Sequence, residues 1–217
     1  MFRISKRNEG PQAQTVAVAG VVLASGTSTR FGSENKLLVE FEGKPIVRRT
    51  ALAYVGARLQ PVVVVVGNDR ERVVRALSGL NVTFVENAEF AEGQSRALRH
   101  GIAALPDAAS AAVIGVGDQP LLAAEVIDSL ADAYWASGAR IVVPRYGGQR
   151  GNPALFAAEL FDELRLVDGD QGGRALIEPH RDEVVWVDVP NPELGEDVDT
   201  PDDLDRLARG ADRDTSA

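Results

Sequence analysis

An unbroken apolar run from Val16 to Ala24 limits the possible folds of this chain more than any other stretch. The run is rich in β-branched valine and carries no polar side chain, which is typical of a strand buried on both faces. A second run of this kind spans Val62 to Val66. Strands that are apolar on both faces occur in parallel sheets covered by helices on either side. The sequence therefore predicts an α/β protein with a mostly parallel sheet.

Strand and helix patterns alternate along most of the chain. After the opening strand, the predicted strands span 62–66, 82–85, 111–116, 140–144 and 184–189. The predicted helices span 45–58, 71–77, 96–104, 123–137 and 202–209, and the segment 168–174 starts a further short helix. This alternation gives right-handed β-α-β units whose helices cover both faces of one sheet. We therefore expect a Rossmann-like fold that binds its ligands at the carboxyl ends of the strands.

The length and the charge of the chain restrict its organisation and its partners. A length of 217 residues suits a single domain, which we expect at 16–209, with a flexible N-terminal arm at 1–15 and a flexible C-terminal tail at 210–217. The net charge of −9 argues against a nucleic-acid partner. No apolar run approaches the ~18 residues of a membrane span, and the first residues do not form a secretory signal. We expect a cytoplasmic protein with no membrane partner.

Small polar residues follow the opening strand directly. The backbone amides of the stretch from Ser25 to Thr29 can approach a ligand closely, and Arg30 and Lys36 add positive charge. The spacing of the glycines matches neither the P-loop nor the dinucleotide-binding fingerprint. Two interpretations remain open: a loop that binds a phosphate-bearing polyanion, and an ordinary connection with two solvated cations.

Three aspartates follow or precede predicted elements at positions suited to a metal ion. Asp118 comes directly after the predicted strand 111–116, whereas Asp197 and Asp199 precede the last predicted helix. Magnesium prefers one or two carboxylates together with substrate phosphates, so Asp118 and Asp199 are our candidate ligands. Because the chain contains no cysteine and two histidines, a thiolate or histidine-rich site is excluded. The alternative is that these acids stabilise a turn and a helix start.

The loop sequence resembles a known family signature. The pattern L-x-x-G-x-S-x-R-x-G followed by Lys begins at Leu23 and ends at Lys36, and it is similar to the loop of nucleotidyltransferases related to the molybdenum cofactor cytidylyl- and guanylyltransferases. Further motifs follow in the family's order: Gly93-Gln94-Ser95, Gly117-Asp118-Gln119-Pro120, Gly151-Asn152-Pro153, Gly169-Asp170-Gln171-Gly172-Gly173-Arg174 and Asp197-Val198-Asp199-Thr200-Pro201. The resemblance implies a single-domain nucleotidyltransferase fold.

The resemblance also implies roles for individual residues. The implied catalytic residues are Arg30, Lys36 and Asp118, and the implied Mg²⁺ ligands are Asp118 and Asp199. The implied nucleotide-binding residues are Leu23, Ala24, Ser25, Gly26, Ser28, Arg30, Lys36, Gly93, Gln94, Ser95 and Asp118. The residues implied on the acceptor side are Asn152, Pro153, Asp170 and Arg174.

The activity implied by the resemblance is Mg²⁺-dependent transfer of CMP from CTP to a phosphorylated small molecule, most readily molybdopterin or its molybdenum form, with release of pyrophosphate. The segment that starts at Gly93 lacks the G-P-L-A-G pattern of the guanylyl branch and so favours CTP. Ser25 matches neither branch, and Asn152 replaces the histidine usual in G-H-P, which leaves the acceptor open.

Two alternative functions remain open beside cytidylyl transfer. The first is guanylyl transfer from GTP to molybdopterin or to a phosphorylated hydroxy acid. The second is a non-catalytic accessory protein that binds the cofactor for a molybdenum hydroxylase, which would make a molybdoenzyme its partner. An accessory protein needs no site for a metal and a triphosphate, so the pattern of Arg30, Lys36 and Asp118 favours an enzyme.

Overall fold

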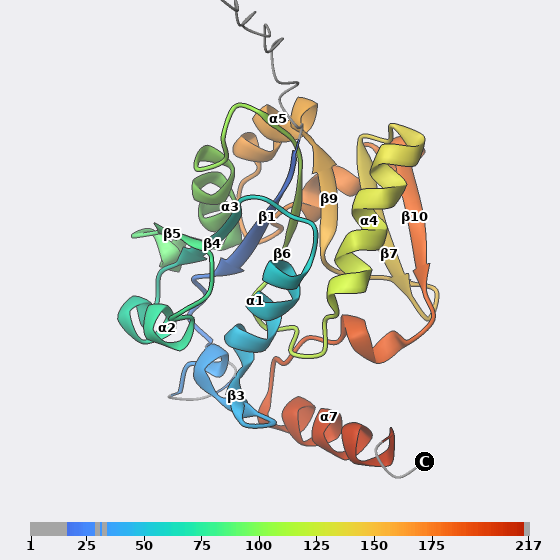
Figure 1. Cartoon of the computed structure of the whole chain (residues 1–217). Helices are drawn as coiled ribbons and strands as arrows, with labels where there is room; N and C mark the ends of the chain where they lie inside the picture. The colour runs from blue at the N-terminus through green and yellow to red at the C-terminus, as the bar shows by residue number, and fades with distance from the viewer. Residues whose placement is uncertain (1–16, 29–30, 32–33, 215–217) are drawn as a thin grey trace, which may run out of the picture.

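The computed structural model describes residues 17–28, 31 and 34–214, and it forms an α/β domain built on one central sheet (Figure 1). The arm expected at 1–15 lies outside the described residues. The strands are β1 (Ala17–Ala24), β2 (Glu40–Phe41), β3 (Lys44–Pro45), β4 (Val62–Val66), β5 (Thr83–Glu86), β6 (Ala109–Val116), β7 (Ile141–Tyr146), β8 (Gln149–Arg150), β9 (Ala154–Ala157) and β10 (Val184–Val189). None of the helices in the described part of the chain is long and apolar enough to cross a membrane.

The helices follow the order predicted from the sequence, with one addition. They are α1 (Ile46–Gly56), α2 (Arg70–Ala76), α3 (Gln94–Ala103), α4 (Ala124–Ser137), α5 (Phe161–Leu166), α6 (Arg174–Ile177) and α7 (Pro201–Asp214). The sequence predicts that the last helix ends at Arg209, whereas α7 continues to Asp214. Helix α5 is not predicted, because its six residues are too few to show a helical period.

The main sheet has the strand order β10-β7-β9-β6-β1-β4-β5. Strand β1 lies in its interior and pairs in parallel with both β4 and β6, in registers that place Gly20 opposite Val62 and Leu23 opposite Val116. The expectation of a mostly parallel sheet is therefore confirmed. The carboxyl ends of β1, β4 and β6 consequently meet at one edge, where open α/β sheets bind ligands.

Strand β9 is the main departure from the predicted topology. It runs antiparallel between β6 and β7, with Ala112 opposite Phe156 and Val142 opposite Leu155. No sequence pattern predicts this strand, because four apolar residues after Pro153 have no detectable period and their direction depends on tertiary pairing. The antiparallel return brings the segment that precedes β9 to the same edge of the sheet as the ends of β1 and β6.

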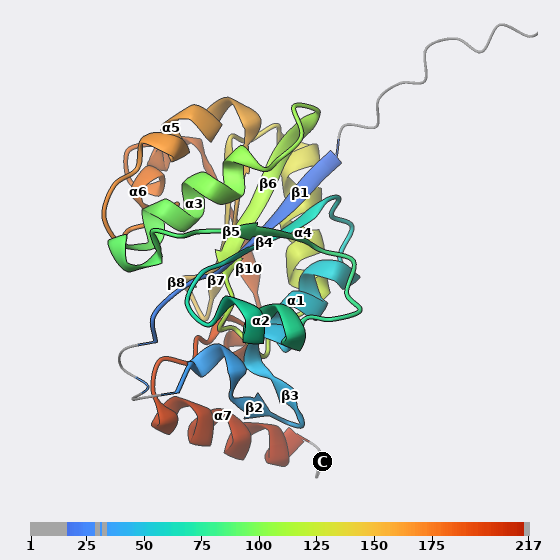
Figure 2. The same ribbon diagram turned by 90° about the vertical axis from the view of Figure 1, so that its left-hand side faces the viewer.

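Helices cover both faces of the sheet, as predicted. Figure 2 shows α3, α5 and α6 on one side of the sheet and α1 and α4 on the other. Each side has its own apolar core: Leu98 and Phe156 belong to one, and Tyr54 and Ile127 belong to the other. All four of these side chains are 0–1% exposed, so the sheet is buried on both faces as its apolar strands require.

A third, smaller core joins α7 to the hairpin of β2 and β3. Leu207 of α7 packs with Phe41 and Ile46, and Val198 completes the cluster. In Figure 2 the same helix lies beside the hairpin, beyond the ends of the sheet strands. Because α7 is anchored on the hairpin, the segment that precedes α7 lies at the same edge of the sheet as the ends of β1 and β6.

Helix α3 lies so close to the sheet that one of its residues has no room for a side chain. A Cβ atom on Gly101 would lie 2.5 Å from Cγ1 of Val21 and 3.2 Å from Cγ2 of Val65. We predict that Gly101→Ala lowers the free energy of unfolding by about 1–3 kcal/mol, because the helix must move away from β1 and β4. Urea unfolding followed by circular dichroism measures the change.

Gly56→Ala is the matched control, since a Cβ atom there would lie 3.5 Å from Cβ of Ala124, an ordinary contact. We expect it to change the free energy of unfolding by less than about 1 kcal/mol. Equal effects of the two substitutions would contradict the close packing of α3.

Candidate active site

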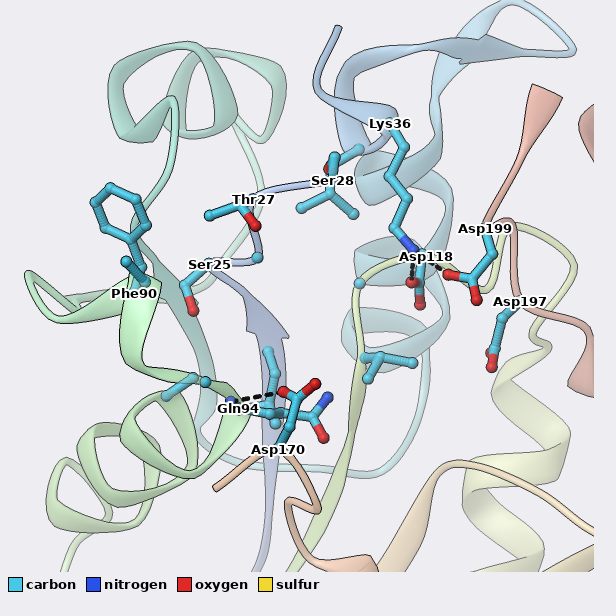
Figure 3. A pocket seen from close by; sticks show the side chains of 18 of the residues that line it. Ser25, Thr27, Ser28, Lys36, Phe90, Gln94, Asp118, Asp170, Asp197 and Asp199 are labelled. Carbon is cyan, nitrogen blue, oxygen red and sulfur yellow. Dashed lines mark hydrogen bonds and ion pairs between the residues drawn. The ribbon is translucent and has the colours of Figure 1, made fainter. Parts of the chain in front are cut away.

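A cavity of about 680 Å³ opens at the carboxyl edge of the sheet. Its walls come from the segments that follow β1, β5 and β6 and from the segment before α7, so residues far apart in sequence surround one space (Figure 3). Its lining includes Ser25, Gly26, Ser28, Lys36, Phe90, Gly93, Gln94, Asp118, Asn152, Asp170, Asp197 and Asp199. Its size is within the range of small-molecule sites, which measure roughly 300–1,000 Å³.

The loop after β1 forms one wall of this cavity. Ser25 is buried, and its Oγ accepts a hydrogen bond from Nδ2 of Asn87 at 3.3 Å. Ser28 has a φ of +54°, a left-handed conformation that costs a non-glycine residue about 1–2 kcal/mol. The Oγ of Ser28 donates to Oδ1 of Asn35 at 3.2 Å. The bond ties the loop to the next turn of the chain.

Asn35 also positions Lys36. Its Oδ1 accepts a hydrogen bond from the backbone N–H of Leu37 at 3.1 Å, and this bond caps the short helical turn Lys36–Leu38. The Lys36 side chain reaches from the turn into the cavity, where its Nζ lies 2.5 Å from Oδ2 of Asp118 and 2.7 Å from Oδ1 of Asp199. Figure 3 shows the ammonium group between the two carboxylates.

Backbone and side-chain bonds hold the two aspartates together. The N–H of Val198 donates to the backbone carbonyl of Asp118 at 2.9 Å, so the segment before α7 runs beside the end of β6. Oδ2 of Asp203 accepts hydrogen bonds from the N–H groups of Asp199 and Thr200, at 3.2 and 2.9 Å. The acidic start of α7 therefore fixes the position of Asp199.

Charges inside the cavity shift one another's protonation equilibria. Burial alone would lower the pKa of Lys36, but the charges and hydrogen bonds of Asp118 and Asp199 outweigh it and raise the pKa. Burial raises the pKa of Asp197 to about 7, and the negative charge of Asp118 adds to the rise. The site thus concentrates more negative charge than Lys36 alone neutralises, which favours a further cation.

The donor set fits a magnesium-type ion that also binds substrate phosphates. Oδ1 of Asp118 is buried and accepts no hydrogen bond within the residues that the structure describes. The same residues contain no group of three acidic, histidine or cysteine side chains arranged to enclose a metal. One or two carboxylates with open positions suit Mg²⁺, which takes its remaining ligands from water and phosphates. The ammonium of Lys36 marks this position as one that holds a cation.

The opposite wall of the cavity is formed by the start of α3 and a loop that crosses it. The backbone N–H of Gln94 donates to Oδ1 of Asp170 at 3.1 Å, and the N–H of Ser95 donates to the carbonyl of Gly169 at 3.2 Å. Gly93 has a φ of +103°, and a Cβ atom there would lie 3.0 Å from the same carbonyl, so glycine is required. The ring of Phe90 lies on this side as well (Figure 3).

A second cavity of about 340 Å³ adjoins the first. The two share the lining residues Leu23, Gln94, Val116, Asn152, Asp170 and Asp197. Arg150 and Arg174 line the second cavity but not the first. Tyr146 supports this region, because its Oη donates to the carbonyl of Asn152 at 2.8 Å. A ligand in one cavity therefore lies next to a ligand in the other.

Most residues singled out from the sequence meet at these cavities. Those that line the first, the second or both are Leu23, Ser25, Gly26, Ser28, Lys36, Gly93, Gln94, Asp118, Asn152, Asp170, Arg174 and Asp199. Ala24, Ser95 and Pro153 line neither cavity. Ser95 is buried on the face of α3 that also carries Leu98 and Ile102, so it points toward the sheet. Arg30 lies outside the described residues.

Sequence reasoning missed several residues of the site. Phe90 and Arg150 line the cavities, but Phe90 lies in a single helical turn and Arg150 in a two-residue strand, both too short to show a periodic pattern. Asn35 acts indirectly, through the turn that carries Lys36. An asparagine before a short apolar turn is a typical N-cap, and that signal was available in the sequence.

Comparison with known proteins gives relatives with three different names. The chain is 35% identical over 126 residues to the bifunctional protein GlmU of Carboxydothermus hydrogenoformans, covering 57% of this chain and 27% of GlmU. It is 29% identical to a probable molybdenum cofactor guanylyltransferase of Natronomonas pharaonis, covering 86% and 95%. It is 26% identical to nicotine blue oxidoreductase of Paenarthrobacter nicotinovorans, covering 88% and 96%. The chain spans about a quarter to a third of the length of the GlmU proteins it matches.

Solved structures show the same fold. A homologue of Mycobacterium tuberculosis Rv0371c from Mycobacterium sp. strain JC1 superposes with a TM-score of 0.78 at 30% identity, covering 90% of this chain and 97% of that one. Rv0371c of M. tuberculosis in complex with manganese superposes with a TM-score of 0.72 at 29% identity, covering 89% and 98%. A divalent metal is therefore present in a structure of a similar protein.

The family match covers most of the segments that build the two cavities, but not the segment before α7 that contains Asp197 and Asp199. Residues 20–184, more than half of the chain, match the MobA-like NTP transferase domain. The matched region begins in β1 and includes Lys36, Asp118 and the loop that contains Asp170. The resemblance noted in the motifs is thereby confirmed, and this chain belongs to the MobA-like NTP transferase family.

Proposed function

We propose that this protein transfers CMP from CTP to the phosphate of molybdopterin or its molybdenum form, with Mg²⁺ as the metal and pyrophosphate as the leaving group. The observation that carries the proposal is the cluster of Lys36, Asp118 and Asp199 at the wall of a 680 Å³ cavity, next to the loop after β1. Such a cluster supplies the charges that a metal-bound triphosphate requires. The family match supports nucleotidyl transfer as the reaction class.

The reaction needs positioning and charge neutralisation more than proton transfer. The loop from Ser25 to Ser28 and the ammonium of Lys36 hold the triphosphate, and Asp118 and Asp199 hold the metal. Mg²⁺ supplies positive charge that stabilises the phosphate oxygens in the transition state. An oxygen of the acceptor phosphate attacks the α-phosphorus, a new phosphorus–oxygen bond forms, and the bond to the β-phosphate oxygen breaks. Pyrophosphate leaves with the electron pair of that bond.

The acceptor occupies the second cavity in this proposal. The two cavities share the wall residues Asn152 and Asp170, which supports an acceptor site beside the metal-binding cluster. Holding both reactants in adjoining cavities turns a bimolecular step into an effectively intramolecular one.

The choice of CTP rests on the segment from Gly93 to Ser95. This segment lacks the G-P-L-A-G pattern of the guanylyl branch and therefore favours the cytidylyl branch. The similarity to a probable molybdenum cofactor guanylyltransferase favours GTP as the alternative. Pyrophosphate release from each of the four NTPs, with Mg²⁺ and molybdopterin, distinguishes them. We predict release that depends on molybdopterin and is fastest with CTP. A preference for GTP would select guanylyl transfer, and no release with any NTP would contradict the enzymatic proposal.

Asp118→Asn separates an enzyme from a cofactor carrier. We predict that it lowers kcat by roughly 10²-fold or more, because an amide cannot replace a charged metal ligand. Asp132→Asn on the exposed face of α4 is the control and should keep full activity. Circular dichroism should show that both variants are folded. Inactivity of the unsubstituted protein together with unchanged molybdopterin binding by Asp118→Asn would indicate a carrier instead.

Lys36→Met tests whether the carboxylates form the metal site. The test measures metal binding and does not rely on turnover. The ammonium of Lys36 competes with a metal ion for Asp118 and Asp199, so its removal should strengthen binding of Mg²⁺ alone by roughly tenfold. Thermal unfolding at increasing Mg²⁺ concentration measures this, since a bound ion raises Tm. Lys44→Met on the exposed hairpin serves as the control. The same Mg²⁺ response in Lys36→Met and in the unsubstituted protein would place the metal elsewhere.

A further inference from the structure

Two arginines that line the second cavity have no ion-pair partner among the described residues. They are Arg150 and Arg174, and neither guanidinium group donates a hydrogen bond within that part of the chain. Many other arginines of that part do have partners, such as Arg49, which pairs with Glu42 at 2.7 Å. Unpaired guanidinium groups at a concave site are a feature of anion recognition.

The two groups act on each other electrostatically. Both residues are exposed at the cavity wall; partial desolvation lowers the pKa of Arg150, and the positive charge of Arg174 lowers it further, against a smaller opposite effect of Glu178. Like charges at one cavity disfavour the unliganded state, and an anion between them removes the repulsion. The cost of assembling two cations therefore favours binding of a negatively charged group.

The backbone that carries Arg150 is held in place by close packing. A Cβ atom on Gly151 would lie within 2.5 Å of the Tyr146 ring, and a Cβ atom on Gly195 would meet the same ring from another segment. Nε2 of Gln119 donates to the carbonyls of Asn152 and Gly195 at 3.4 and 2.9 Å. Arg150 thus extends from a fixed strand end, which is the arrangement expected of a pre-organised binding site.

We infer that Arg150 and Arg174 form an anion subsite that binds a second negatively charged group of the acceptor, at the end remote from the phosphate that reacts. The subsite is distinct from the catalytic cluster, because Lys36, Asp118 and Asp199 line the first cavity and these arginines line the second. The inference rests on the proposed function for the identity of the ligand as an acceptor. It defines the substrate class as a small molecule with a phosphate at one end and another anion at the other.

The second anion has two chemical sources. In molybdopterin it is the dithiolene sulfur pair, and in a phosphorylated hydroxy acid it is a carboxylate. Both are planar groups with two negatively charged atoms that a pair of guanidinium groups can bind. Molybdopterin and phosphoglycolate are therefore the two probes, and ethyl phosphate, which lacks the second anion, is the reference.

Binding of each probe is measured by calorimetry with Arg150→Gln, Arg174→Gln and the unsubstituted protein, in the presence of Mg²⁺ and a CTP analogue with a non-hydrolysable α,β linkage. We expect each substitution to weaken binding of the two-anion probe by roughly 10- to 100-fold, the loss of a charge-assisted hydrogen bond, and to leave ethyl phosphate binding unchanged. The probe that loses affinity identifies the anion as dithiolene or carboxylate. Arginine-to-lysine variants should recover part of the loss.

Arg75→Gln is the matched control, since Arg75 is an exposed arginine of α2 that lines neither cavity. It should bind every probe as the unsubstituted protein does. Unchanged binding of both two-anion probes by Arg150→Gln and Arg174→Gln would overturn the subsite. Failure of the proposed function has a different signature: no pyrophosphate with any NTP, while the dependence of probe binding on the two arginines persists.

Discussion

The structure of the site depends on holding several carboxylates together at one edge of the sheet. Lys36 lies 2.5 Å from Asp118 and 2.7 Å from Asp199, and burial with the charge of Asp118 raises the pKa of Asp197 to about 7. Like charges at these positions repel one another, and a single ammonium does not neutralise them all. The surrounding fold therefore provides the constraint that keeps them in place, and the metal ion of the metal-bound triphosphate that we propose as ligand would balance their charge.

That constraint is transmitted through the backbone. The N–H of Gly117 donates to the carbonyl of Leu23, which extends the pairing of β1 and β6 to the point where both loops begin. The N–H of Val198 then bonds to the carbonyl of Asp118, so α7 and its preceding segment are fixed relative to the sheet. Strand β9, inserted antiparallel, brings Asn152 and the second cavity beside this edge. The cluster of Lys36, Asp118 and Asp199 and the pair of Arg150 and Arg174 consequently lie at the same edge of the sheet.

Local pattern and parallel pairing made much of this arrangement predictable from the sequence. Buried valine runs defined β1 and β4, and the shared edge of parallel strands was enough to place Lys36 near Asp118. Tertiary features were not predictable in this way: the direction of β9, the inward orientation of Ser95 and the contribution of Arg150 all depend on contacts between distant segments. The choice between CTP and GTP likewise depends on contacts to the base, and Ser25, which matches neither branch of the family, contributes no preference.

Anomalous diffraction from crystals grown with Mn²⁺ and a non-hydrolysable CTP analogue tests the metal–triphosphate site most directly. We predict an anomalous peak about 2.2 Å from a carboxylate oxygen of Asp118, with the triphosphate against the loop after β1 and Nζ of Lys36 on a phosphate oxygen instead of between the aspartates. Lys36 still paired with both aspartates, and no manganese peak at Asp118 while nucleotide is bound, would contradict the assignment of this cluster as the metal site.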